Sequence, residues 1–233
     1  MKKKLLALFL VTSLVCASFA GCGNSESDAE DTSSTAVEEN GAEEEEEETE
    51  IMPQRGVIAD GAYTNEAFGI SFPVADNLIV CTDEQIAQML NMGQDMLAED
   101  GTYDVEDMEE AMDGAIYDTV IMLSDNQSNV MVMYEDLEET GAIAYTEEQY
   151  AKAVANQLEA MQSMGYESQG ITTESIGGTD FTVMTMGANG YFQKYYLHKV
   201  GGYMIEFITT FTEASEAEMN TFMSGVTFTD PTK

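Results

Sequence analysis

Basic residues are scarce in this sequence, and several residue types on which enzyme chemistry depends are nearly missing. Its 233 residues include 8 Lys and Arg against 44 Asp and Glu, one histidine, three cysteines and no tryptophan. A nucleic-acid-binding protein needs a basic surface, so that class is excluded. Zinc takes three or four His, Cys or carboxylate ligands, and a serine triad needs a histidine beside its nucleophile. Because His198 stands alone and no G-x-S-x-G motif is present, we expect neither such a triad nor a cofactor.

Long apolar runs are also missing, apart from one at the N-terminus. Three lysines, Lys2 to Lys4, precede an apolar stretch from Leu5 to Val15. This stretch is shorter than the about 20 residues that a membrane-spanning helix needs. A basic head, a short apolar core and small residues after it are typical of a secretory signal peptide. We predict such a signal peptide over residues 1–21.

The end of that signal carries a cysteine. Phe19-Ala20-Gly21-Cys22 resembles the lipobox of bacterial lipoproteins, in which the cysteine thiol receives diacylglycerol before cleavage. The resemblance implies that Cys22 is lipidated and becomes the new N-terminus. A diacylglyceryl group supplies the two acyl chains that stable anchoring takes. We therefore expect a protein anchored at the extracytoplasmic face of the cell membrane, with an ordinary secreted protein as the alternative.

Apolar residues are almost absent from the segment that follows. Residues 23–50 are mainly Ser, Thr, Gly, Asn, Asp and Glu, with an unbroken acidic run from Glu43 to Glu48. Such a segment has too little apolar surface to offset its chain entropy, and its like charges extend it. We predict that residues 22–56 form a disordered acidic tether, which leads to a single domain over 57–233. A cation-binding or docking tail is the alternative.

The predicted domain is itself one-sided in charge. Between Arg55 and Lys152 there are 22 acidic residues and no basic one. Such a surface usually keeps a protein soluble, and a cationic partner or divalent cations are the functional alternatives. One acidic loop offers oxygen ligands of the kind that calcium takes, but it lacks the spacing of an EF-hand. The residues of this candidate calcium site are Asp100, Asp104, Glu106 and Asp107.

Strand and helix patterns follow one another through the domain. Alternating apolar residues indicate strands, and Thr-x-x-Gln sequences at Thr82 and Thr146 are typical of capping boxes that begin helices. Gly177-Gly178, Asn189-Gly190 and Gly201-Gly202 predict hairpin turns. The predicted strands are 68–72, 79–81, 117–123, 130–134, 171–176, 181–186, 191–200 and 203–211, and the predicted helices are 82–100, 105–112, 146–164 and 213–224.

Helices thus fall among antiparallel strands without strict alternation, which favours an α+β fold with an antiparallel sheet. In the strand over 203–211, Tyr203 and Ile205 lie on one face, and Met204 and Ile208 lie on the other. Because both faces are apolar, we predict helices on both sides of the sheet.

Sulfur-containing residues are expected mainly in the core. Methionine occurs 17 times, and its flexible side chain fills irregular gaps between other residues. An adaptable binding groove and a soft Cu(I) site are the alternatives. Cys81 is the only cysteine of the predicted domain and lies in an apolar stretch, so we expect a buried small hydrophobe.

One stretch of the domain resembles a known family. The sequence is Tyr63-x-Asn65-x-x-Phe68-Gly69-Ile70-x-Phe72-Pro73, and the helix from Thr146 and the closing hairpins, helix and Val226-Thr227-Phe228 follow in the same order. Over about residues 61–229 the chain is similar to the PsbP-like superfamily. The resemblance implies an α/β/α sandwich. Its members include an extrinsic photosystem subunit, a Ran-binding release factor and bacterial lipoproteins, which mostly bind partners and do not catalyse.

Tyrosines provide the last candidate site. Tyr191, Tyr195 and Tyr203 lie in neighbouring predicted strands, where an uncovered face would bind a peptide or a glycan. We therefore predict a non-catalytic module that binds a protein, glycan or cationic partner at the cell envelope. The alternative is a hydrolase of envelope or nutrient polymers that uses carboxylates.

Overall fold

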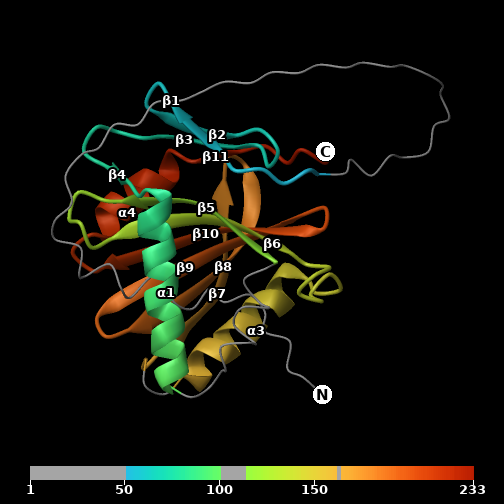
Figure 1. Ribbon diagram of the computed structural model, residues 1–233. Coiled ribbons are helices and arrows are strands. Elements are labelled where there is room, and N and C mark those ends of the chain that lie inside the picture. The colour runs from blue at the N-terminus through green and yellow to red at the C-terminus, as the bar shows by residue number, and fades with distance from the viewer. Residues whose placement is uncertain (1–50, 101–113, 162–163) are drawn as a thin grey trace.

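The computed structural model describes residues 51–100, 114–161 and 164–233 (Figure 1). The predicted signal peptide, the lipobox, most of the acidic tether and the predicted helix over 105–112 lie outside these residues. A large antiparallel sheet carries two helices on one face, and a smaller sheet with a further helix lies on the other. Among the described residues, none of the helices has the length and apolar character needed to span a membrane.

Seven strands make the main sheet, and neighbouring strands in it are antiparallel. Its last four strands in sequence are joined by the predicted hairpin turns, which are confirmed. At one of these turns Asn189 has a φ of 52° and Gly190 a φ of 85°, the left-handed values that a two-residue hairpin turn needs. The strand order is β4 (Ile79–Val80), β5 (Ala115–Met122), β6 (Asn129–Asp136), β10 (Tyr203–Thr212), β9 (Tyr191–Val200), β8 (Thr179–Ala188) and β7 (Glu167–Ile176).

A second antiparallel sheet brings the two ends of the described chain together. Its strands are, in order, β1 (Val57–Ala59), β2 (Ala62–Asn65), β3 (Ile70–Pro73) and β11 (Thr227–Phe228). β11 pairs with β3, so the C-terminal strand closes the sheet that the first strands begin. β1 and β2 are joined by Asp60 and Gly61 alone, which have φ values of 52° and 74°.

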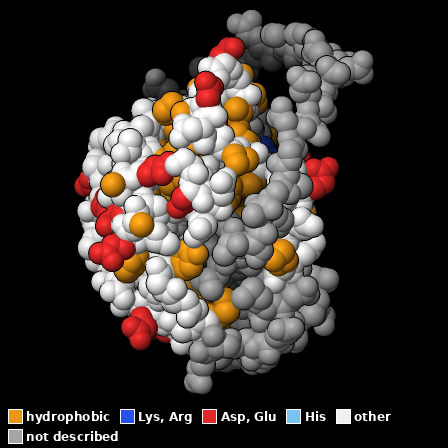
Figure 2. All heavy atoms as spheres, turned by 90° about the vertical axis from the view of Figure 1, so that its left-hand side faces the viewer, with side chains coloured by type: hydrophobic (Ala, Val, Ile, Leu, Met, Phe, Trp, Pro, Cys, Tyr) orange, Lys and Arg blue, Asp and Glu red, His pale blue; other side chains and the backbone are white. Residues whose placement is uncertain are grey.

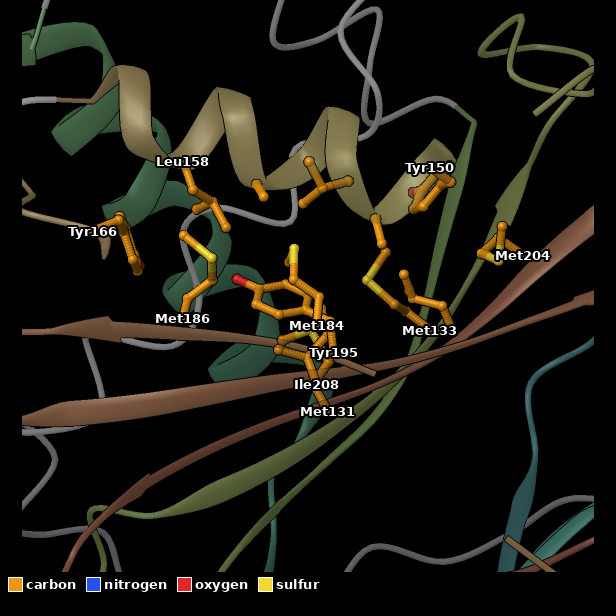
Figure 3. Packing of buried hydrophobic residues seen from close by; sticks show 14 of the residues in the cluster. Met131, Met133, Tyr150, Leu158, Tyr166, Met184, Met186, Tyr195, Met204 and Ile208 are labelled. Carbon is orange, nitrogen blue, oxygen red and sulfur yellow. The ribbon is translucent and has the colours of Figure 1, made fainter. Parts of the chain in front are cut away.

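The main sheet has an apolar core on each face, because successive side chains of a strand point to opposite sides. One core lies under α1 (Asp83–Asp100) and α3 (Glu147–Ala160), and the other lies under the small sheet and α4 (Glu216–Ser224). Figure 3 shows Tyr150 and Leu158 of α3 pointing toward the sheet. Methionine fills much of the space beneath them, as predicted. The methionines labelled there are Met131, Met133, Met184, Met186 and Met204.

Both helices over the first core begin at the predicted capping boxes. The backbone N–H of Gln149 donates to Thr146 Oγ1 at 3.2 Å, and the backbone N–H of Thr146 donates to Gln149 Oε1 at 3.0 Å. Thr82 and Gln85 make the same reciprocal pair at 2.8 and 3.3 Å. Each box satisfies two backbone donors that a helix start would otherwise leave unpaired.

The predicted α+β class, with an antiparallel sheet and helices on both faces, is confirmed. The second face holds a small sheet in addition to α4, because β1, β2, β3 and β11 pair with one another. The expectation of a fully buried Cys81 is wrong, since this residue is half-buried. It follows β4 at the edge of the main sheet, where one side stays open. Burial still raises the pKa of its thiol to about 11, which keeps it protonated at neutral pH.

The structured domain also begins earlier than residue 57. Ile51 packs on the second core, and the carbonyl of Gln54 accepts a hydrogen bond from Asn65 Nδ2 at 2.7 Å. Arg55 and Gly56 bind Asp118 of β5. The predicted boundary therefore cuts off residues that contact the domain, because their partners, Asn65 and Asp118, lie far from them in the sequence.

Candidate functional site

The three tyrosines predicted as one ligand-binding face do not share a surface. Tyr195 is fully buried beneath α3 (Figure 3). Tyr203 lies on the opposite face of the sheet, where its ring meets that of Phe68 edge-on at 5.6 Å. Tyr191 is half-buried, and its hydroxyl lies 3.4 Å from Gln127 Oε1. The structure thus corrects the prediction, since strand alternation and the cover by α3 separate the three side chains.

Most of the acidic loop that we predicted as a calcium site lies outside the described residues. Asp104, Glu106 and Asp107 lie outside them, and Asp100 ends α1 without a described side chain. Within 51–100, 114–161 and 164–233, no group of three or more His, Cys, Asp or Glu side chains is placed to hold a metal ion. The calcium-binding loop stays a prediction from the sequence.

Asp118 is the hub of a buried polar cluster between the two sheets. A bulge in the pairing of β5 with β6 falls at this residue, and its carboxylate is 2% exposed. It accepts hydrogen bonds from the Tyr134 hydroxyl at 2.7 Å, from Asn65 Nδ2 at 3.0 Å and from the Gly56 N–H at 2.9 Å. The Tyr63 hydroxyl donates a further one. Burial, and then the charge of Asp118, raise the pKa of Tyr63 and keep it protonated as a donor.

The Asp118 cluster explains the spacing of Tyr63 and Asn65 in this chain. Both lie on β2, two residues apart, and point inward toward the same carboxylate. Arg55 closes the cluster from outside by donating to the Asp118 carbonyl at 2.5 and 3.0 Å and by pairing with Asp83 at 2.7 Å. The motif that suggested the family thus serves to fasten the small sheet to the main one.

A second buried cluster joins two glutamates of the main sheet to α3. Glu135 of β6 and Glu206 of β10 are both fully buried, and the hydroxyl of Tyr150 hydrogen-bonds to both, at 2.9 Å from Glu206 Oε1. A hydroxyl has one proton, so two carboxyl partners require a second proton on one of them. Burial, and then the charge of Glu135, raise the pKa of Glu206 well above its usual range. The Glu135–Glu206 pair therefore holds one proton in the folded protein.

His198 lies near the C-terminal end of β9, between two carboxylates. Its Nδ1 is 3.1 Å from Glu147 Oε1, at the start of α3, and its Nε2 is 3.9 Å from Asp230 Oδ2 in the C-terminal segment. Burial raises the pKa of Asp230, but hydrogen bonds from Lys233 and Thr232 outweigh it and bring the pKa to about 2. The histidine thus connects α3, β9 and the C-terminal segment.

Three carboxylates of the domain lie inside these clusters, away from solvent. A general acid or base must come within hydrogen-bond reach of the bond that it acts on. Asp118, Glu135 and Glu206 are at most 2% exposed, and their hydrogen bonds go to neighbouring protein groups. We assign these three side chains to holding the sheets and α3 together.

The exposed counterpart to these clusters is an apolar surface at two sheet edges. β1 ends the small sheet and β4 ends the main one, and none of their five residues is buried. Val57 is 64% exposed, Ile58 39%, Ile79 48% and Val80 36%. We call Val57, Ile58, Ala59, Ile79 and Val80 the apolar edge surface. Figure 2 shows a group of hydrophobic side chains in the upper half of this side of the molecule, where β1 and β4 lie, and others scattered below it.

Sequence reasoning found β4 but missed β1 and β2. The signal for β1 was present in Asp60-Gly61, a dipeptide that favours the two-residue turn of a hairpin. It separates Val57-Ile58-Ala59 from the strand that contains Tyr63. The three-residue length of β1 hid this signal, since it leaves too few positions to show alternation.

Comparisons with known proteins give similarity of fold only. No family model matches the chain, and no curated protein matches it. Among solved structures, the chain is similar to the cyanobacterial PsbP protein CyanoP from Synechocystis sp. PCC 6803, with 12% identity and a TM-score of 0.45 over 76% of this chain and 99% of that one. It is also similar to LpqN, involved in cell envelope biogenesis of Mycobacterium tuberculosis, with 11% identity and a TM-score of 0.37 over 69% of this chain and 83% of that one. The comparison thus finds the structural similarity to a PsbP protein that we expected from the sequence. This similarity does not assign a role to any residue of the chain.

Proposed function

We propose that this protein is a lipid-anchored, extracytoplasmic module that binds a partner and carries no catalytic activity of its own. The observation that carries the binding role is the apolar edge surface. Monomeric soluble proteins seldom keep neighbouring apolar residues exposed on unpaired strand edges, where they invite association. A surface of this kind is expected where a partner covers it.

The enclosed clusters support a role without catalysis. The buried carboxylates Asp118, Glu135 and Glu206 contact other parts of the fold, which gives them a structural reason to be present. The apolar edge surface offers packing area and free backbone groups but no acid or base of its own. Binding is therefore the activity that these described residues serve best.

The anchoring part of the proposal rests on Phe19-Ala20-Gly21-Cys22. Replacing Cys22 by Ala removes the thiol that would carry diacylglycerol. We expect this variant to move from the membrane fraction to the soluble or unprocessed fraction. Metabolic labelling with a tagged fatty acid is expected to mark the wild type only.

Cys81→Ala is the matched control for that experiment, because it removes a cysteine from the domain and leaves the lipobox intact. It should keep both the label and the membrane location. Label that persists on Cys22→Ala, or label lost from Cys81→Ala, would show that the anchor has been assigned to the wrong cysteine.

A further inference from the structure

We propose that the apolar edge surface binds an extended, basic segment of a protein partner, which adds as a strand to the edges of β1 and β4. This inference deepens the proposed function and rests on it. Strand addition supplies backbone hydrogen bonds from the edge and places alternate side chains of the segment against the sheet. The contrast between the sheet edges of this protein is the first argument.

The edge strand β7 shows how this chain protects an edge that stays in water. Its exposed residues are polar or glycine, whereas its two isoleucines, Ile171 and Ile176, are half-buried and buried. A bulge between Ser168 and Gly170 also interrupts its pairing. Polar residues and bulges are the usual protection of free edges. β1 and β4 have neither, since all five of their residues are apolar and exposed, and only their shortness, three and two residues, limits the edge that they leave open.

The two unprotected edges come close to each other beside β5. Val80 of β4 pairs with Ile121, while Gly56, next to β1, donates its N–H to the carboxylate of Asp118. These two positions on β5 are three residues apart, which is about 10 Å along a strand. Arg55 spans the interval, because it contacts both Asp118 and Asp83, just after β4. A single extended segment of a few residues reaches both edges.

The charge around these edges selects a basic segment. From residue 51 to 84 there are five acidic residues and one basic residue, and the acidic ones are all exposed. The basic residue, Arg55, is engaged by Asp83 at 2.7 Å. Figure 2 shows acidic side chains among the hydrophobic ones on this side. The acidic residues are Asp60, Glu66, Asp76, Asp83 and Glu84.

The same charge disfavours two other occupants. A second copy of the chain would bring two acidic surfaces together, and like charges that face each other across an interface oppose association. An anionic membrane would be repelled for the same reason. A segment that alternates Lys or Arg with apolar residues matches both the exposed valines and isoleucines and the acidic residues beside them.

The test uses the purified lipid-free chain over residues 23–233 and a fluorescent short peptide of alternating Lys and Val. Fluorescence anisotropy gives its Kd. We expect Ile79→Ser and Val57→Ser each to raise the Kd at least about tenfold, as the loss of one packed aliphatic side chain implies. Added NaCl should also raise the Kd of the wild type.

Ile143→Ser is the matched control. Ile143 is 40% exposed but lies in a loop away from these strands, so this variant should bind the peptide with the Kd of the wild type.

Several outcomes would overturn the inference. These are an equal Kd for Ile79→Ser and Ile143→Ser, equal binding of a peptide with Glu in place of Lys, and equal binding of a peptide with its lysines and valines in separate blocks. A wild-type dimer that Ile79→Ser dissociates would assign the surface to a second copy. Binding to phosphatidylglycerol vesicles that Ile79→Ser abolishes would assign it to lipid. None of these outcomes changes the expected fatty-acid label on Cys22, so the anchoring proposal and the peptide-binding inference are judged separately.

Discussion

Asp118→Asn is expected to destabilise the folded protein by about 3 kcal/mol, the lower part of the range for breaking a buried charged network. The carboxylate of Asp118 accepts hydrogen bonds from Tyr63, Tyr134, Asn65 and the Gly56 N–H. An amide supplies one acceptor oxygen and turns an N–H₂ group toward the remaining donors. Those donors are buried, so each unsatisfied one adds its desolvation cost. Urea unfolding followed by circular dichroism measures the change.

Asp60→Asn is the matched control for Asp118→Asn. It makes the same chemical change at an exposed turn residue with a φ of 52°, where Asn is as well suited as Asp. Its effect should stay within about 0.5 kcal/mol, as for most surface changes. If both variants unfold at the same urea concentration, Asp118 does not fasten the two sheets as described.

The loss in Asp118→Asn should be uneven across the molecule. Asp118 joins β5 of the main sheet to β2 and to the segment before β1, and its partners Tyr63 and Tyr134 belong to the core under the small sheet, not to the core under α3. Amide exchange is therefore expected to rise first in β1, β2 and β3, since local opening follows the loss of local contacts. Such opening would also weaken peptide binding at the apolar edge surface.

Local sequence signals predicted much of the fold, because their physical cause lies within a few residues. The capping boxes at Thr82 and Thr146 and the glycine turns between the last four strands are of this kind. The alternation in 203–211 also predicted correctly that both faces of the sheet are covered.

The clusters were beyond such signals because their members come from distant parts of the sequence. Tyr63 and Asp118 are 55 residues apart in the chain, and Glu206 lies 56 residues from Tyr150. Asp118 differs from the other acidic residues between Arg55 and Lys152 in lying inside a predicted strand, 117–123, but the sequence does not show which distant side chains it contacts. The tyrosine site failed for a related reason, since only the position of α3 decides that Tyr195 is buried.

Buried and exposed acidic residues therefore have opposite consequences in this protein. The exposed ones keep the surface negative and, in our proposal, select a basic partner. The buried ones hold elements together but make the fold sensitive to their protonation. Glu206 is the clearest case, because its pKa is raised and the contact with Tyr150 lies under α3.

Glu206→Gln is expected to stabilise the protein increasingly as the pH rises above about 5. Because the pKa of Glu206 is higher in the folded state than in the unfolded chain, the folded state holds a proton that the unfolded state releases above its ordinary pKa of about 4.3. Wild-type stability then falls with rising pH, by up to about 1.4 kcal/mol per pH unit for one such proton, until the folded pKa is passed. Gln keeps an acceptor for Tyr150 and has no proton to lose, so its contribution does not change with pH.

The measurement is urea unfolding of the wild type and Glu206→Gln at several pH values from 4 to 9, with the difference between the two plotted against pH. The groups that face Glu206 are Glu135, Tyr117, Tyr150 and Tyr195, and the burial-raised pKa values of the three tyrosines keep them protonated over this range. Taking the difference cancels groups that are not coupled to Glu206. Glu213→Gln, an exposed control of equal charge change, should give a curve parallel to that of the wild type. A difference for Glu206→Gln that stays constant from pH 4 to 9 would mean that Glu206 does not hold a proton in the folded state.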